Sequence, residues 1–253
     1  MSVATDEPQS TGGVRVVRSG GVVTATIDRP RRANALDAAT VEQLLTVVED
    51  AGVQDTRALV LRGEGRHFCA GFDMTHVLEQ SEGDLLLRFV RIEQLLQRLR
   101  RAPFLTVACV GGNAVGAGAD IVAACSHRLL DPGAILRFPG FRFGVALGTR
   151  HLAALVGTQA ARALLLESRA VDAAMALELG LGTALITREH QRAQVEEIVA
   201  AADALDNLSL TTALARTSTI TDADDAFDMA ALVSSLARAG LHKRLANYLD
   251  QGR

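Results

Sequence analysis

The sequence predicts an α/β fold that is followed by an α-helical C-terminal region. Three observations lead to this prediction. Short apolar runs typical of strands alternate with single amphipathic helices as far as about residue 187. Residues 107–125, VACVGGNAVGAGADIVAAC, combine a strand-like start, a glycine-rich turn and a helix. From Arg188 onward the pattern is helical, with breaks near Asn207, Thr221 and Gly240.

The first elements follow from turn and capping signals. Ser19-Gly20-Gly21 lies between two β-branched runs, which predicts a hairpin. Pro30 and its charged neighbours then form a loop, and Asp37 or Thr40 caps the next helix. The predicted strands are residues 14–17, 22–27, 58–61, 128–130, 135–138 and 184–186. The predicted helices run from residue 37 or 40 to about 52, and over residues 84–101, 158–167 and 172–179.

The glycine-rich turn is the chemically informative stretch. It contains Gly111, Gly112, Gly116 and Gly118 and leads into a helix with Asp120 in its first turn. The first backbone N–H groups of a helix have no intrahelical acceptor and lie at the positive end of its dipole. The turn is therefore suited to bind an anion, or an oxygen that becomes anionic during a reaction.

Two other interpretations of this stretch are disfavoured. A dinucleotide fingerprint requires a third Gly or Ala where Ile121 stands, and no suitable following strand carries an acidic residue. A membrane span is opposed by Asn113, Asp120 and the glycines, because an unpaired carboxylate in lipid is costly. A buried strand, turn and helix is the interpretation that we adopt.

Composition limits the classes of function. A chain of 253 residues with a net charge of −3 suggests neither a nucleic-acid surface nor a polybasic membrane anchor. Cys69, Cys109 and Cys125 lack metal-ligand spacing, and their odd number suits reduced thiols in a cytoplasmic protein. No signal-peptide pattern is present at the N-terminus. We predict a flexible leader over residues 1–13, an α/β core over 14–187 and a helical oligomerisation region over 188–253.

Several motifs occur in a familiar order. They are Asp28-Arg29-Pro30 with Asn34-Ala35-Leu36, then Phe68-Cys69-Ala70-Gly71-Phe72-Asp73, then residues 103–120, and finally Gly180-Leu181. In this order and spacing they resemble the enoyl-CoA hydratase/isomerase (crotonase) family. The resemblance implies a crotonase-like spiral of ββα units with C-terminal helices. It also implies an acyl-CoA thioester ligand and a homotrimer or homohexamer, with no partner nucleic acid or membrane.

The resemblance also implies a site. The backbone N–H groups of Phe72 and Ala117 would form an oxyanion hole, and Asp120 would occupy the position of the family's first catalytic glutamate. No permanent cofactor and no metal is implied, since coenzyme A arrives as part of the substrate. The positions matched to coenzyme A or thioester binding are Arg32, Ala33, Ala35, Leu36, Ala70, Gly71, Asp73, Met74, Val115, Gly116, Gly118, Pro139 and Gly140.

One departure changes the expected reaction. The family's second glutamate follows a proline, but here Pro139 is followed by Gly140. Arg142, Arg150 and His151 are the polar candidates for replacing it. We therefore expect isomerase- or lyase-type proton transfer by Asp120 rather than standard hydration. The alternative is an acyl-CoA-binding protein without catalysis.

Structural roles compete with some of these assignments. Asp120 either serves only to complement the dipole of its helix or, in a dry pocket that raises its pKa, acts as a base. Asp73 is expected to order the turn that holds Phe72. Arg29, Arg31 and Arg32 either meet coenzyme A phosphates or form a solvated loop. The tail has apolar positions beyond what one helical layer needs to bury, which motivates the oligomer: Leu232, Val233, Leu236, Leu241 and Leu245.

Overall fold

The structure is a computed structural model that describes residues 9–10 and 12–251. In this part of the chain a seven-stranded sheet has the order β1-β2-β3-β4-β5-β7-β10, and a three-stranded sheet has the order β6-β8-β9. The strands are β1 (Gln9–Ser10), β2 (Val14–Ser19), β3 (Val22–Ile27), β4 (Ala58–Gly63), β5 (Leu105–Val110), β6 (Ala114–Val115), β7 (His127–Leu130), β8 (Ile135–Arg137), β9 (Val171–Asp172) and β10 (Ala184–Leu185). The α-helices are α1 (Ala38–Val53), α2 (Glu82–Arg100), α3 (Ala117–Ala124), α4 (Thr149–Val156), α5 (Thr158–Glu167), α6 (Ala173–Glu178), α7 (Gln191–Ala202), α8 (Asn207–Thr217), α9 (Asp222–Ala237) and α10 (Leu241–Gln251), with short 3₁₀ turns at η1 (Pro30–Arg32), η2 (Val77–Glu79) and η3 (Gly140–Phe143).

The large sheet is buried on both faces. β2 and β3 form the predicted antiparallel hairpin, and β3, β4, β5, β7 and β10 run parallel. Successive side chains of a strand point to opposite faces. Accordingly Val60 and Val107 pack into one apolar cluster, whereas Leu61 and Ala108 pack into the other. The near-continuous apolar sequence of β4 and β5 is what a parallel sheet covered on both sides requires.

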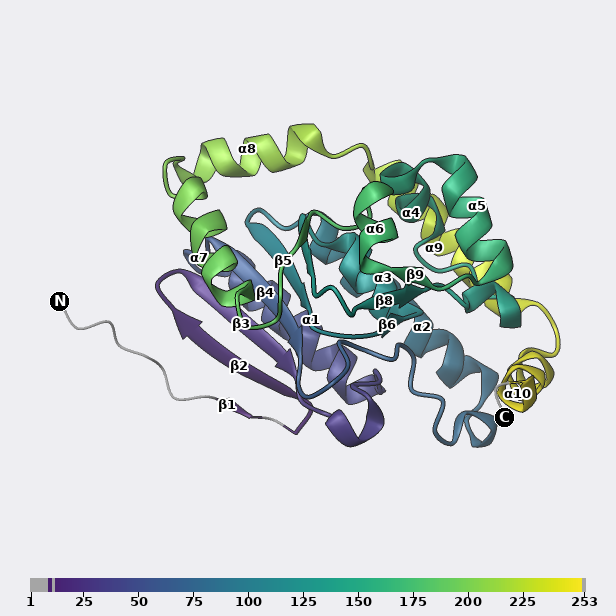
Figure 1. Ribbon diagram of the computed structural model, residues 1–253. Coiled ribbons are helices and arrows are strands. Elements are labelled where there is room, and N and C mark those ends of the chain that lie inside the picture. The colour runs from purple at the N-terminus through teal and green to yellow at the C-terminus, as the bar shows by residue number, and fades with distance from the viewer. Residues whose placement is uncertain (1–8, 11, 252–253) are drawn as a thin grey trace.

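The C-terminal helices cover two separate parts of this core (Figure 1). α7 and α8 contribute Val195, Val199 and Leu210 to the cluster on one face of the sheet. α9 and α10 join the other cluster, on the side of α2 and α3. The expectation that the apolar tail positions need a neighbouring subunit is wrong for most of them. Each of the following is at most 2% exposed inside its own chain: Leu232, Leu236, Leu241 and Leu245.

The predicted helices and hairpin are confirmed, with small shifts at their ends. Asp37, rather than Thr40, caps α1 by accepting a hydrogen bond from the Thr40 N–H at 2.8 Å. α4 is absent from the sequence-based predictions, because it has eight residues and follows Gly148 instead of a side-chain cap. β6 and β9 have two residues each, which is too short for a detectable period.

The division into leader, core and tail stays a prediction. Residues 9–10 of the predicted leader form β1, which pairs with β2, and residues 1–8 and 11 lie outside the described residues. Within the described ranges no single helix is long and apolar enough to cross a membrane. The bent pair α7 and α8, at 106° to each other, meets the length and composition criteria only jointly.

Candidate active site

Two glycine-containing turns lie against each other at the centre of the site. The Val115 N–H donates to the Cys69 carbonyl at 2.9 Å, and the Leu36 N–H donates to the Gly71 carbonyl at 2.7 Å. Gly71 has a φ of +83°, and a side-chain carbon there would lie 2.4 Å from the Val115 carbonyl oxygen. Glycine is therefore required at position 71 for both its backbone conformation and its contact.

The predicted pair of backbone donors is available in this arrangement. Among the described residues, no group accepts a hydrogen bond from the N–H of Phe72 or of Ala117. Ala117 is the first residue of α3, where N–H groups lack intrahelical acceptors. A side-chain carbon on Gly71 would lie 3.1 Å from the Ala117 nitrogen, so the two turns bring the donors into one neighbourhood.

Both donors line the same cavity, which has a volume of about 90 Å³. Among its lining residues, only Asp120 and Tyr248 carry oxygen or nitrogen atoms in their side chains. The remainder of the wall is apolar or backbone, which excludes water and strengthens electrostatic interactions inside. The lining residues are Ala70, Phe72, Met74, Phe89, Val115, Gly116, Ala117, Asp120, Phe138, Pro139, Gly140, Phe141, Phe143, Val145, Leu147, Leu165 and Tyr248.

Asp120 is a buried carboxyl group on a buried helix. It is 7% exposed, and every residue of α3 is buried. Burial, and then the charge of Glu93, raises the pKa of Asp120 well above its ordinary value, against an opposing effect of Arg100. Gly148 packs directly on this carboxyl group, since a side-chain carbon there would lie 2.6 Å from Asp120 Oδ1. The dry surroundings that a carboxylate base requires are therefore present.

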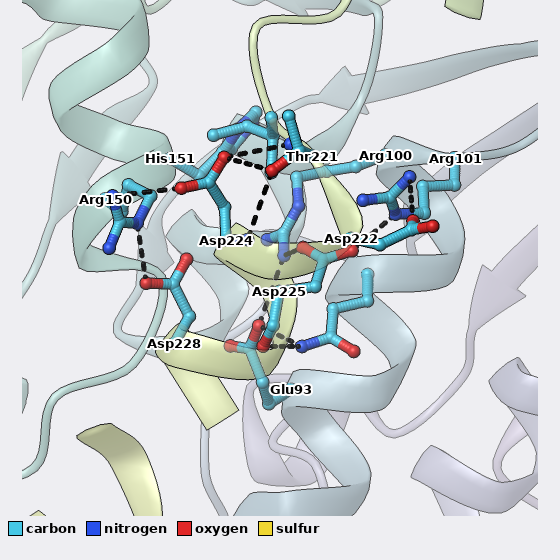
Figure 2. Close-up of polar contacts among 12 residues, drawn as sticks. Glu93, Arg100, Arg101, Arg150, His151, Thr221, Asp222, Asp224, Asp225 and Asp228 are labelled. Atoms are coloured by element: carbon cyan, nitrogen blue, oxygen red, sulfur yellow. Dashed lines mark hydrogen bonds and ion pairs between the residues drawn. The ribbon is translucent and has the colours of Figure 1, made fainter. Parts of the chain in front are cut away.

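A buried ion-pair network joins α2 to α9 (Figure 2), and two of its members, Glu93 and Arg100, act electrostatically on Asp120. Glu93 is 1% exposed and pairs with Arg100 at 3.2 Å. Arg100 also pairs with Asp225 of α9 at 2.9 Å, and Asp225 pairs with Arg101 as well. Burial raises the pKa of Glu93 despite its bonds to Arg100. The tail helix α9 thus supplies Asp225, the second carboxylate that pairs with the buried Arg100.

The sequence analysis missed Glu93, although a signal for it exists. Glu93 lies four residues after Phe89 and seven before Arg100, which places all three on one side of a helix. A carboxylate and a guanidinium on the apolar side of a helix indicate a buried pair rather than a solvated surface.

The turn that carries Phe72 is held rigidly. The Phe72 ring stacks on the Phe89 ring, with 4.1 Å between centroids and 5° between planes. The Arg88 guanidinium lies 3.9 Å from the centroid of the Phe72 ring. Asp73 accepts hydrogen bonds from the Thr75 N–H and from Arg29, each at 3.0 Å. These contacts give Asp73 the structural role of ordering the turn, as expected.

The predicted ligand-binding positions divide into two groups. Besides Phe72, Ala117 and Asp120, the predicted positions that line the cavity are Ala70, Met74, Val115, Gly116, Pro139 and Gly140, whose role in binding stays a prediction. Leu36 is 0% exposed, and a side-chain carbon on Gly118 would lie 2.3 Å from the Cys69 carbonyl oxygen. Leu36 and Gly118 therefore pack against the turn of residues 68–73. The role of the following positions in binding coenzyme A stays a prediction: Arg32, Ala33, Ala35, Leu36, Gly71, Asp73 and Gly118.

The three arginines of the basic loop, Arg29, Arg31 and Arg32, differ in whether their charge is already paired. Arg29 is bound to Asp37 at 2.9 Å and to Asp73 at 3.0 Å, so its charge is already compensated. Arg31 and Arg32 are exposed. Only these two side chains are therefore left with a charge available to a phosphate.

The three polar candidates for replacing the missing glutamate do not line the cavity. Arg142 donates to the Glu167 carbonyl at 2.8 Å, and Arg150 pairs with Asp224 and Asp228 of α9 (Figure 2). His151 Nε2 is 2.7 Å from the Ala123 carbonyl, and burial lowers the pKa of this histidine to about 4. None of the three candidates therefore replaces the missing glutamate in the wall of this cavity, where Gly140 stands at the position after Pro139.

Comparison with known proteins identifies what this arrangement is similar to. The family model described as enoyl-CoA hydratase/isomerase matches residues 17–236. A crystal structure of a Bordetella parapertussis protein named for the enoyl-CoA hydratase/isomerase family superposes with a TM-score of 0.90 at 40% identity, covering 93% of this chain and 98% of that chain. The agreement shows an α/β crotonase fold with two sheets and C-terminal helices.

Sequence relatives carry more than one activity in their names. A Mycobacterium tuberculosis protein named enoyl-CoA hydratase echA6 is 33% identical over 190 residues, which is 73% of this chain and 75% of that protein. Ethylmalonyl-CoA decarboxylase of Gallus gallus is 30% identical over 182 residues, which is 70% of this chain and 61% of that protein. Both names specify an acyl-CoA thioester, but they differ in the reaction.

Proposed function

The chain belongs to the enoyl-CoA hydratase/isomerase family of acyl-CoA-processing enzymes, and we propose that it transfers a proton on a thioester enolate with Asp120 as its single acid–base carboxylate. The observation that carries this proposal is the combination of two unpaired backbone donors and one buried carboxyl group in one apolar cavity. Among the residues that line this cavity Asp120 is the one carboxylic acid, and Gly140 stands where the family's second glutamate is expected.

The proposed chemistry begins with the thioester oxygen between the N–H groups of Phe72 and Ala117. When ionised Asp120 takes the proton from the α-carbon, the C–H electron pair moves towards the thioester carbonyl and its oxygen becomes negative. Preformed donors stabilise this charge without reorganisation, and the loss of one donor typically costs about 3–4 kcal/mol. Protonated Asp120 then returns the proton to another carbon of the conjugated enolate, which shifts the double bond.

The electrostatics of the cavity support Asp120 as a base. A carboxyl group whose pKa is raised by burial is, once ionised, a stronger base than an ordinary surface carboxylate. Glu93 contributes to this shift from behind, while Arg100 limits it. Addition of water needs a second group that positions and deprotonates the water, so we expect hydration to be slower by about 10²–10⁴-fold than with paired carboxylates.

A lyase variant uses the same oxyanion hole. Decarboxylation of a malonyl-type thioester also places negative charge on the thioester oxygen, and the similarity to ethylmalonyl-CoA decarboxylase makes this substrate class part of the test. In that case Asp120 would deliver the proton that replaces carbon dioxide.

A thioester panel tests the proposal. We expect the wild type to isomerise a 3-enoyl-CoA or decarboxylate a malonyl-type CoA, and to hydrate crotonyl-CoA very slowly. Rapid hydration would contradict the single-carboxylate mechanism. Tight binding of acyl-CoA without turnover of any panel member would favour the alternative, an acyl-CoA-binding protein. No binding of any thioester, measured by calorimetry against the free acids, would remove the proposal altogether.

Assembly and compartment complete the proposal. We propose a homotrimer or homohexamer, which light scattering at micromolar concentration tests directly; a monomer would refute it. A cytoplasmic location is supported by Cys69, Cys109 and Cys125, which are free and buried. Burial raises the pKa of these thiols to about 12, 11 and 12 respectively, so they stay protonated and unreactive.

A further inference from the structure

The second polar side chain of the cavity, Tyr248, comes from the last helix of the chain. It is the only tyrosine in the sequence. Leu241, Leu245 and Tyr248 follow each other at helical spacing and lie on one face of α10. The two leucines are 0% exposed, so this face is directed into the protein. Tyr248 is half-buried and packs on the same apolar cluster.

The position of Tyr248 is fixed by contacts on both sides of it. Arg244 Nε donates to the Phe143 carbonyl at 3.1 Å, and His242 Nε2 is 2.7 Å from the Gln80 carbonyl. The Tyr248 ring packs on Phe143 with 4.9 Å between centroids and 54° between planes. α10 therefore docks on η3 and on the segment after η2 and delivers its tyrosine to the cavity wall.

The hydroxyl group of Tyr248 has no hydrogen-bond partner within the part of the chain that the structure describes. The Tyr248 ring packs on Phe143, and the other lining residues of the cavity apart from Asp120, including Phe141 and Leu165, have no polar side-chain atom. A hydrocarbon acyl chain would remove water from this hydroxyl without replacing the lost hydrogen bond, which is unfavourable.

We propose that Tyr248 is a specificity-determining residue whose hydroxyl group hydrogen-bonds a neutral oxygen on the acyl chain, so that the substrate class is a hydroxyacyl- or oxoacyl-CoA. The inference rests on the proposed function, because the thioester must occupy the same cavity. A neutral oxygen is favoured over a carboxylate because Asp120, the other lining residue with a polar side chain, is itself a carboxylic acid. Asp120 remains the acid–base group, and Tyr248 selects which thioester reaches it.

A matched ligand pair tests this inference by binding alone. Calorimetry gives dissociation constants for butyryl-CoA and for both enantiomers of 3-hydroxybutyryl-CoA with the wild type, Tyr248→Phe and Leu165→Val. Tyr248→Phe deletes only the hydroxyl group. Leu165→Val is the control, since it removes one methylene from the same wall without changing a polar group.

We expect the wild type to bind one hydroxy enantiomer about tenfold more tightly than butyryl-CoA. Tyr248→Phe should abolish this preference. Leu165→Val should weaken the binding of both ligands by a similar factor and so leave the preference unchanged. No preference in the wild type, or an equal preference in Tyr248→Phe, would overturn the inference while leaving the proposed function intact. Failure of every thioester to bind would instead overturn both.

Discussion

The two polar side chains of the cavity, Asp120 and Tyr248, are held by very different helices. α3, which carries Asp120, is buried along its whole length and follows a turn packed on a second turn. α10, which carries Tyr248, is amphipathic, and only one face of it is buried. The difference indicates a division of labour. Our two proposals assign the reaction chemistry to the interior helix, where little change is tolerated, and the selectivity to the peripheral helix, which can change without loss of the fold.

The largest effect is expected where the two turns touch. In Gly71→Ala the new methyl group would lie 2.4 Å from the Val115 carbonyl oxygen. Displacement of the Phe72 donor should reduce kcat by about 10²–10³-fold. Gly12→Ala is a matched control, because Gly12 has nearly the same φ, +82°, with nothing within 4 Å. Steady-state kinetics with both variants separates the contact from backbone strain; equal activity of the two would contradict the predicted clash.

A large loss of stability is expected beneath the site. Asp225→Asn removes a charged partner from the buried Arg100, and breaking such a pair by one member costs about 3–5 kcal/mol. Asp222 lies on the same helix as Asp225 and pairs with Arg101, but the Asp222 side chain is 95% exposed. Asp222→Asn should therefore change the free energy of unfolding little. Urea unfolding measures both free energies. A similar small change in both variants would show that α9 does not complete the network under Asp120.

Asp120 should also make stability depend on pH. Since burial raises its pKa in the folded state, the folded protein keeps a proton that the unfolded chain has already lost. The resulting stabilisation is complete below the ordinary carboxyl pKa and is lost as pH rises through the raised value. Asp120→Asn removes this loss, so the free energy of unfolding of the variant relative to the wild type should increase with pH. A constant difference from pH 4 to pH 9 would contradict the raised pKa.

The smallest effect is expected in α10. Arg244→Ala removes hydrogen bonds to the carbonyl groups of Phe143, Arg238 and Ala239 and loosens the helix. We expect KM to rise about three- to tenfold with kcat nearly unchanged, because substrate contacts weaken while Asp120 stays in place. Lys243→Ala is the control, since Lys243 is exposed. A fall in kcat without a change in KM would argue against separate roles for α3 and α10.

The sequence and the structure agree where local rules decide the geometry. The meeting of Phe72, Ala117 and Asp120 at one cavity was predictable. The glycines around them specify tight turns, and the order of the motifs along the chain indicated that these turns lie together. Tyr248 and Glu93 were not singled out, because their roles depend on which distant helix docks beside them. Burial of Leu241 and Leu245 is likewise a property of tertiary packing. An apolar helix face predicts that something covers it, but not whether the cover is the same chain or another subunit.

The pH dependence of turnover sharpens the assignment of Asp120. As a base it must be ionised, so kcat/KM for isomerisation should rise with pH through its raised pKa. Glu93→Gln removes a neighbouring negative charge and should move this rise to lower pH. Arg98→Gln is the control and should leave the profile in place, because the half-buried Arg98 pairs with Glu49 and is not among the charges that shift the pKa of Asp120. An identical profile for wild type and Glu93→Gln would exclude Glu93 from the electrostatics of the site.

Deuterium exchange at the α-carbon of a bound enoyl-CoA tests the central claim most directly. The measurement compares the wild type with Asp120→Asn in deuterated water by mass spectrometry or NMR. We predict exchange by the wild type and a decrease of about 10²–10⁴-fold in Asp120→Asn, because the amide cannot accept the proton while both backbone donors remain. Equal exchange by the two proteins would contradict the account and remove Asp120 from the mechanism.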